Sequence, residues 1–103
     1  MMLESRKPNG QIVTGSVQLI HAAGMHARPA VKLTKLAKRF SAKIAVRVGG
    51  AADWIDAKSI AKVMAMRAAR DSMIEFEASG PDAQAAVAAL VMLVARDFPD
   101  MAR

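Results

Sequence analysis

Residues 24–30 read Gly-Met-His-Ala-Arg-Pro-Ala, and they determine where the first helix of the chain begins. Proline has no backbone N–H, so Pro29 belongs in the first turn of a helix, where that donor would have no intrahelical partner. The helix therefore begins just before Pro29, with His26 near its N-cap. Gly24 allows the backbone to turn sharply ahead of the histidine.

Apolar residues continue downstream at spacings of three and four, which predicts a helix over residues 27–40. Its buried stripe consists of Ala30, Leu33, Ala37 and Phe40, and a second face carries Arg28, Lys32, Lys35 and Arg39. Around this helix, alternating apolar and polar residues predict strands. These strands cover residues 12–20, 43–48, 53–57 and 72–78.

Two more helices complete the pattern. Ser59 suits the N-cap of a short helix over residues 59–66. The triplet Gly80-Pro81-Asp82 opens the last helix, because proline fits the first turn and the acid faces the positive end of the helix dipole. The apolar face of that helix consists of Ala83, Ala86, Val87, Leu90, Val94 and Phe98. The order βαββαβα predicts a two-layer α+β sandwich.

The chain of 103 residues is long enough for one domain with a modest hydrophobic core. We expect this domain to span residues 12–98, between a flexible N-terminal tail over residues 1–11 and a short C-terminal tail over residues 99–103. The lack of cysteine excludes disulfides and Cys-based zinc sites. There is no signal peptide and no apolar run long enough to cross a bilayer, which predicts a cytoplasmic protein without membrane insertion.

The formal net charge of +6 is compatible with a nucleic acid, an acidic protein surface or a phosphorylated ligand as partner. An RNA-recognition fold has a similar order of elements, but it needs aromatic side chains on the exposed face of the sheet. The strands here offer only Trp54 and Phe76, and Phe76 falls on the inward side. We therefore expect no nucleic acid partner. A small-ligand regulatory domain is a further alternative, although no Gly-rich phosphate loop supports it.

His26 is the main candidate for chemistry. A histidine at a helix start lies beside backbone N–H groups without intrahelical partners, and these groups favour negative charge over an imidazolium. The cationic Arg28, two residues further on, also favours a negative charge there and disfavours a protonated imidazole. A neutral, nucleophilic imidazole beside an anion site suits the capture and release of a phosphoryl group. The simpler alternative is a histidine that only caps a helix.

The stretch GMHARPA resembles the phosphorylation-site motif of HPr, the histidine-containing phosphocarrier family of the bacterial phosphoenolpyruvate-dependent phosphotransferase system. Residues 57–64, Ala-Lys-Ser-Ile-Ala-Lys-Val-Met, resemble the second helix of that family, which opens with a regulatory serine in many members. Residues 78–82, Ala-Ser-Gly-Pro-Asp, resemble the segment before its last helix. Together the three blocks extend the resemblance to roughly residues 12–98.

This resemblance implies an open-faced β-sandwich, in which three helices cover a four-stranded antiparallel sheet. It implies that His26 receives a phosphoryl group on Nδ1 from enzyme I of the system and passes it to a IIA-type protein or domain for sugar uptake. Arg28 matches the arginine that pairs with the phosphoryl group. Such a protein is a monomeric carrier without cofactor or metal, and other enzymes act on it. The nitrogen-related branch of the family, with a regulatory output, is the alternative.

The resemblance also concerns regulation and docking. Ser59 matches the serine that HPr kinase/phosphorylase modifies in some bacteria, a role compatible with plain helix capping. The resemblance implies an apolar patch surrounded by cations, on which the acidic surfaces of partner proteins would dock. The apolar members would be Met25, Ile60, Ala61, Met64 and Ala65, and the cations would be Arg28, Lys35, Lys38, Lys58 and Lys62. His21 is interpreted as a strand-end residue without a nearby carboxylate, and Trp54 as a packing residue.

Overall fold

The computed structural model of the chain describes residues 12–100, so residues 1–11 of the expected N-terminal tail and residues 101–103 lie outside the described residues. Within the described part, the elements are β1 (Ile12–Gln18), α1 (Ala27–Ala37), β2 (Lys43–Val48), β3 (Ile55–Asp56), α2 (Ile60–Ala65), β4 (Met73–Ser79) and α3 (Ala83–Ala95). This order confirms the predicted βαββαβα arrangement. None of these helices is long and apolar enough to cross a membrane.

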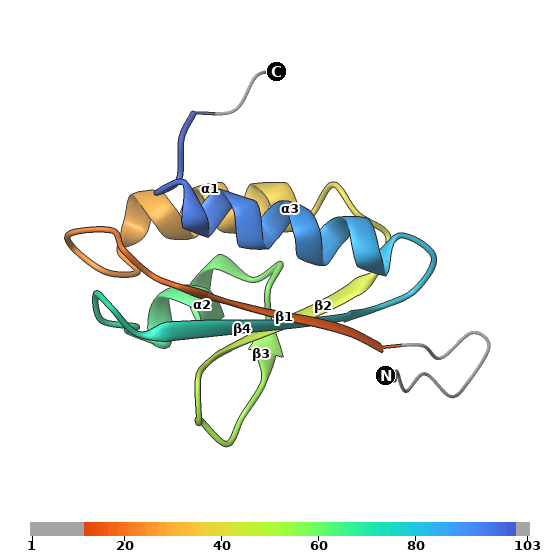
Figure 1. The fold of residues 1–103 in the computed structure, drawn as a ribbon, viewed down its shortest axis with the longest axis horizontal. Helices are drawn as coiled ribbons and strands as arrows, with labels where there is room; N and C mark the ends of the chain where they lie inside the picture. Colours follow the sequence, from red (N-terminus) through yellow and green to blue (C-terminus); the bar gives the residue numbers. More distant parts are fainter. Residues whose placement is uncertain (1–11, 101–103) are drawn as a thin grey trace.

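The strands form an antiparallel sheet in the order β1-β4-β2-β3. Helices α1 and α3 lie side by side over one face of this sheet, while α2 contacts α1 and β3 (Figure 1). Within residues 12–100, the other face carries no helix, which confirms the open-faced sandwich. Because α3 runs back along the sheet, its C-terminal end lies close to the loop that leads from β1 into α1 (Figure 1).

The core lies between the sheet and the helices, and β4 is its central strand. Phe76, which is fully buried, pairs with Gly15 of β1 on one side and Val46 of β2 on the other. A Cβ atom on Gly15 would lie 2.8 Å from Cγ1 of Val87 on α3, so a larger residue there would force the two to move apart. The missing side chain of Gly15 therefore allows α3 to pack directly onto β1, and the inward direction predicted for Phe76 is confirmed.

On the open face, the indole of Trp54 lies beneath the guanidinium of Arg47, whose Cζ is 4.3 Å from the ring centroid. Nε of Arg47 also donates to Oε1 of Glu75 at 2.6 Å. Trp54 is half-buried in this arrangement. Among residues 12–100, the aromatic side chain of the open face is therefore already stacked against Arg47, which argues against the RNA-recognition alternative.

Several elements are shorter than their patterns predict. Strand β1 stops at Gln18 rather than at residue 20, and α3 stops at Ala95, before Phe98 of its predicted apolar face. Helix α1 stops at Ala37, and residues 38–40 continue as turns, with the N–H groups of Arg39 and Phe40 bonded three residues back. The Nζ atom of Lys58 donates to the Phe40 carbonyl at 2.7 Å, which satisfies a carbonyl beyond the helix end. Strand β3 pairs with β2 over two residues only, so its predicted length is too great.

Asp82 has a role that the sequence did not predict. It is the N-cap residue of α3, but its side chain makes no capping hydrogen bond to that helix. Its carboxylate instead accepts the N–H groups of Ser41 at 2.9 Å and Ala42 at 2.8 Å. Because these donors precede β2, the acid anchors the entry to the central sheet. The hydrogen bond from Ser41 above all lowers the pKa of Asp82.

Candidate functional site

His26 is the N-cap residue of α1, with an extended backbone at φ −99° and ψ −173°. Its carbonyl accepts the N–H of Ala30 at 2.9 Å, and its own N–H donates to the Gly24 carbonyl at 2.9 Å. The imidazole makes no capping hydrogen bond, and the residue is exposed. The backbone therefore begins the helix while the ring stays accessible, which argues against the simple capping alternative.

The first turn of α1 provides a place for an anion. Among residues 12–100, the structure records no acceptor for the N–H groups of Ala27 and Arg28, and Pro29 carries no N–H at all. These groups lie at the positive end of the helix dipole. An anion held at His26 would therefore meet backbone donors without displacing an existing hydrogen bond.

His26 opens into a surface hollow of about 710 Å³. The hollow is lined by His21, Ala23, His26, Ala27, Arg28, Pro29, Val31, Lys32 and Lys35. Its permanently charged lining residues, Arg28, Lys32 and Lys35, are all cations. This single sign of charge favours a small anionic group and an acidic partner surface.

The loop before His26 approaches the segment that follows α2. Gly24 has φ +73°, and a Cβ atom there would lie 2.6 Å from the Ala68 carbonyl oxygen. The same oxygen accepts the N–H of Met25 at 2.9 Å. Only glycine combines this conformation with this close approach. As a consequence, the Met25 side chain points into the core and is 5% exposed, so the expectation that it contributes to the docking patch is not supported.

Helix α2 presents the rest of the expected docking patch. Ile60 and Met64 are each 41% exposed, and Ala61, Lys62 and Ala65 are exposed as well. On α1, Lys35 and Lys38 are exposed too. Lys58 differs from these cations because its ammonium is bound to the Phe40 carbonyl.

Ser59 is the N-cap of α2, as the sequence predicts. Its Oγ accepts the N–H of Lys62 at 3.3 Å, and its carbonyl accepts the N–H of Val63 at 2.9 Å. Because Ile60 begins the exposed face of α2, a charge added at Ser59 would lie next to the docking patch.

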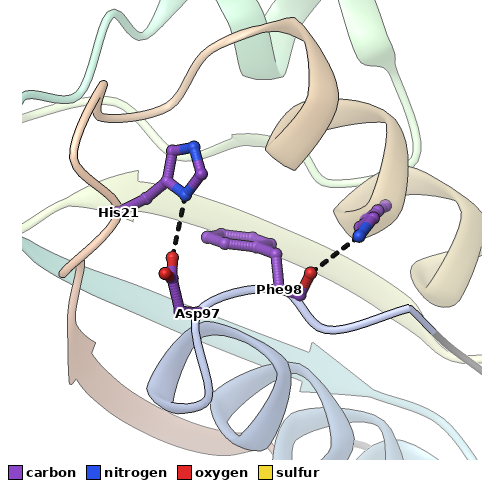
Figure 2. A network of polar contacts seen from close by, with 4 residues as sticks. His21, Asp97 and Phe98 are labelled. Atoms are coloured by element: carbon purple, nitrogen blue, oxygen red, sulfur yellow. Dashed lines mark hydrogen bonds and ion pairs between the residues drawn. The ribbon is translucent and has the colours of Figure 1, made fainter.

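Three residues beside the site were not identified as a group from the sequence. Nδ1 of His21 lies 2.8 Å from Oδ1 of Asp97, and the His21 ring meets the Phe98 ring edge-on at a centroid distance of 5.9 Å (Figure 2). The expectation that His21 has no nearby carboxylate is therefore wrong. Asp97 is 76 residues away in the sequence, and no local pattern connects the two.

Lys32, from the second turn of α1, reaches the same segment. Its Nζ donates to the Phe98 carbonyl and to Oδ1 of Asp100, each at 2.7 Å. The hydrogen bond and charge of Lys32, with a smaller contribution from Arg28, lower the pKa of Asp100. One cation of the hollow, Lys32, thus already binds a carboxylate, which agrees with the expected preference for anions.

An open-faced sandwich with an exposed histidine at the cationic start of α1 is the arrangement expected of a phosphocarrier domain. The family model described as "PTS HPr component phosphorylation site" matches residues 13–96. The chain therefore belongs to the HPr family of phosphocarriers of the phosphotransferase system. Proteins of this family carry a phosphoryl group between other proteins and are not catalytic enzymes.

Individual relatives agree with this assignment. The phosphocarrier protein HPr of Cupriavidus necator is 40% identical over 80 residues, which are 78% of this chain and 88% of that protein. The phosphocarrier protein NPr of Escherichia coli K12 is 33% identical over 88 residues, or 85% of this chain and 97% of that protein. The crystal structure of HPr-C-His from Thermoanaerobacter tengcongensis superposes with a TM-score of 0.78 at 28% identity, covering 87% of this chain and 99% of that one.

Proposed function

We propose that His26 is the phosphoryl acceptor of this carrier and that Arg28 neutralises the bound group. The observation that carries the proposal is the exposed imidazole at the start of α1, which makes no capping hydrogen bond. It lies next to three lining cations and to backbone N–H groups for which residues 12–100 offer no recorded acceptor. Phosphoryl transfer asks a protein mainly to position the reacting atoms and to stabilise charge. This site supplies both while leaving the ring open to a partner.

The reaction exchanges one P–N bond for another. A ring nitrogen of His26, Nδ1 by resemblance to the family, attacks the phosphoryl group on the donor histidine of enzyme I, and the donor bond breaks. The phosphoryl oxygens then lie against the Arg28 guanidinium and the N–H groups of the first turn of α1. The reverse exchange hands the group to a histidine of a IIA-type protein or domain.

The partner surface consists of the exposed face of α2 and the neighbouring cations. Ile60 and Met64 supply apolar contact area, while Lys35, Lys38 and Lys62 attract acidic surfaces. Charges at the rim of an interface mainly accelerate encounter, and the apolar centre supplies affinity. We expect enzyme I and IIA proteins to use this surface in turn, in the cytoplasm and with the carrier as a monomer.

Sugar uptake is the proposed output, and the nitrogen-related branch is the alternative. Relatives named HPr and NPr both match most of this chain, so the family assignment is shared by the two branches. Transfer rates to purified IIA proteins of each branch, from the same organism as this chain, distinguish them. The sugar proposal requires faster transfer to a sugar-specific IIA domain, and preferential transfer to the nitrogen-related IIA protein would favour the alternative.

Regulation through Ser59 is part of the same proposal. A phosphate there would add about −1.5 to −2 charge beside Ile60, where acidic partners approach. Ser59→Asp should therefore slow transfer from enzyme I, and Ser59→Ala should leave the rate close to that of the wild type. Equal rates for both variants would contradict the regulatory role.

The carrier function is tested by intact-protein mass spectrometry after incubation with phosphoenolpyruvate and enzyme I of matched origin. We expect one added phosphoryl group that is labile in acid. The chain has two histidines, which provides a matched control. His26→Ala should receive no phosphoryl group, whereas His21→Ala keeps the acceptor and should still receive one by the end of the incubation, whatever its rate. A folded wild-type protein without added mass would refute the proposal.

A further inference from the structure

The C-terminal turn of α3 holds the chain on both sides of His26. Asp97 binds the imidazole of His21, five residues before His26, and the Phe98 carbonyl binds the ammonium of Lys32, six residues after it. Both contact residues line the hollow beside His26. Two consecutive residues of one turn therefore anchor the loop and the helix that meet at the phosphoryl site (Figure 2).

A chain of hydrogen bonds leads from this turn to His26. The Asp97 carboxylate can only accept, so Nδ1 of His21 donates to it. The carbonyl of His21 accepts the N–H of Gly24, and the carbonyl of Gly24 accepts the N–H of His26, each at 2.9 Å. The hydrogen bond that holds the His21 side chain is therefore connected, through the His21 and Gly24 carbonyls, to the turn that positions the His26 backbone.

The turn itself adopts a conformation that its residues disfavour. Asp97 has φ +60° and Phe98 has φ +54°. The N–H of Phe98 binds the Leu93 carbonyl and that of Asp97 binds the Val94 carbonyl, which is a Schellman motif with Asp97 at the position where glycine is preferred. Residues other than glycine keep a positive φ only where several surrounding contacts hold them in that conformation. Here the surroundings are His21, Lys32 and the core, in which Phe98 is 4% exposed.

We propose that Asp97 and His21 are positioning residues for phosphoryl transfer, which hold the loop before α1 so that His26 faces an incoming donor. This inference rests on the proposed function of His26. Neither residue needs to touch the phosphoryl group. Asp97 acts through the His21 imidazole, and His21 acts through its carbonyl on the turn that ends at His26.

The variant Asp97→Gly separates an effect on the positioning of His26 from an effect on the stability of the domain. Glycine relieves the positive φ and removes the carboxylate, so the folded domain should keep its thermal midpoint or gain in it. Loss of the anchor should nevertheless lower kcat for phosphoryl transfer from enzyme I about tenfold, with little change in KM for the carrier. Asp97→Asn keeps an acceptor oxygen for His21 and should retain most of the wild-type rate. Glu75→Gln, which breaks an ion pair on the open face, is the matched control and should transfer at the wild-type rate.

Amide hydrogen exchange of Gly24 and His26 provides a second readout that does not depend on any partner. Both amides should exchange faster in Asp97→Gly than in the wild type, and no faster in Glu75→Gln. A wild-type kcat in Asp97→Gly, or unchanged exchange at both amides, would overturn the positioning role. If the wild type itself is not phosphorylated, the proposed function of His26 fails, and the exchange comparison still decides whether the turn holds the loop.

Discussion

Gly24→Ala should destabilise the domain by about 2–3 kcal/mol. An alanine at φ +73° carries the cost of the left-handed region, about 1–2 kcal/mol, of which the reduced entropy of the unfolded chain offsets up to about 1 kcal/mol. In addition, the new Cβ atom would lie 2.6 Å from the Ala68 carbonyl oxygen, a backbone atom that cannot swing away. Separating the two segments breaks the hydrogen bond from Met25 to that oxygen, which adds about 1–2 kcal/mol.

Gly50→Ala is the matched control. Gly50 has φ +85°, and a Cβ atom there would meet nothing within 4 Å. This substitution therefore carries the backbone cost alone, and its net effect should be about 1 kcal/mol or less. The difference between the two variants isolates the contact between the loop before α1 and Ala68.

Urea unfolding at equilibrium measures both effects, since the midpoint shifts by the lost free energy divided by the slope, m. We expect unchanged slopes and a clearly larger shift for Gly24→Ala than for Gly50→Ala. Equal shifts would contradict this account, because the approach of Gly24 to Ala68 would then have no energetic consequence. Slower phosphoryl transfer to Gly24→Ala should accompany its instability, because the same turn carries His26.

Three further predictions concern the rest of the fold. The lowered pKa of Asp82 stabilises the folded chain above the ordinary carboxyl value of 3.8, and this stabilisation is lost as the pH falls through the folded-state pKa. Asp82→Asn should therefore lower the thermal midpoint at pH 7, and the difference from the wild type should shrink towards pH 3; a constant difference would contradict the charge-based account. Ser59→Ala should lower the unfolding free energy by about 1 kcal/mol in urea, because α2 loses its N-cap; an unchanged midpoint would show that the cap is dispensable. Phe76→Ala should remove about 3–5 kcal/mol, because the ring is fully buried at the centre of the sheet; a loss below about 1 kcal/mol would place Phe76 outside the core.

The start of α1 could be predicted from the sequence because its signals are local. Proline in the first turn, glycine before the histidine and apolar residues at helical spacing all act within one or two turns of the chain. The same holds for the inward face of β4 and for Ser59 at the N-cap of α2. Each of these features depends on backbone geometry and side-chain period, which neighbouring residues determine.

Asp82, the acid before α3, has contacts that local sequence patterns do not predict. Its position before the helix is typical of a cap, yet its carboxylate binds Ser41 and Ala42, about 40 residues away. Two N–H groups before β2, one exposed and one part-buried, take the carboxylate oxygens that could otherwise cap the helix. The packing of α3 against the sheet brings Asp82 within reach of them. The burial of Met25 also depends on a contact distant in sequence, because its loop packs against Ala68 and the Met25 side chain therefore lies in the core.

The order of elements, the inward faces and the histidine at the helix start follow from the amino-acid sequence alone, since these features depend on interactions within a few residues. The side chains that surround this histidine are brought together by tertiary packing. His21 meets Asp97 across 76 residues, and Lys32 meets Phe98 across 66. Such pairs arise because α3 packs back along the sheet and ends beside the start of α1. Local sequence patterns do not predict where one element ends relative to another in space.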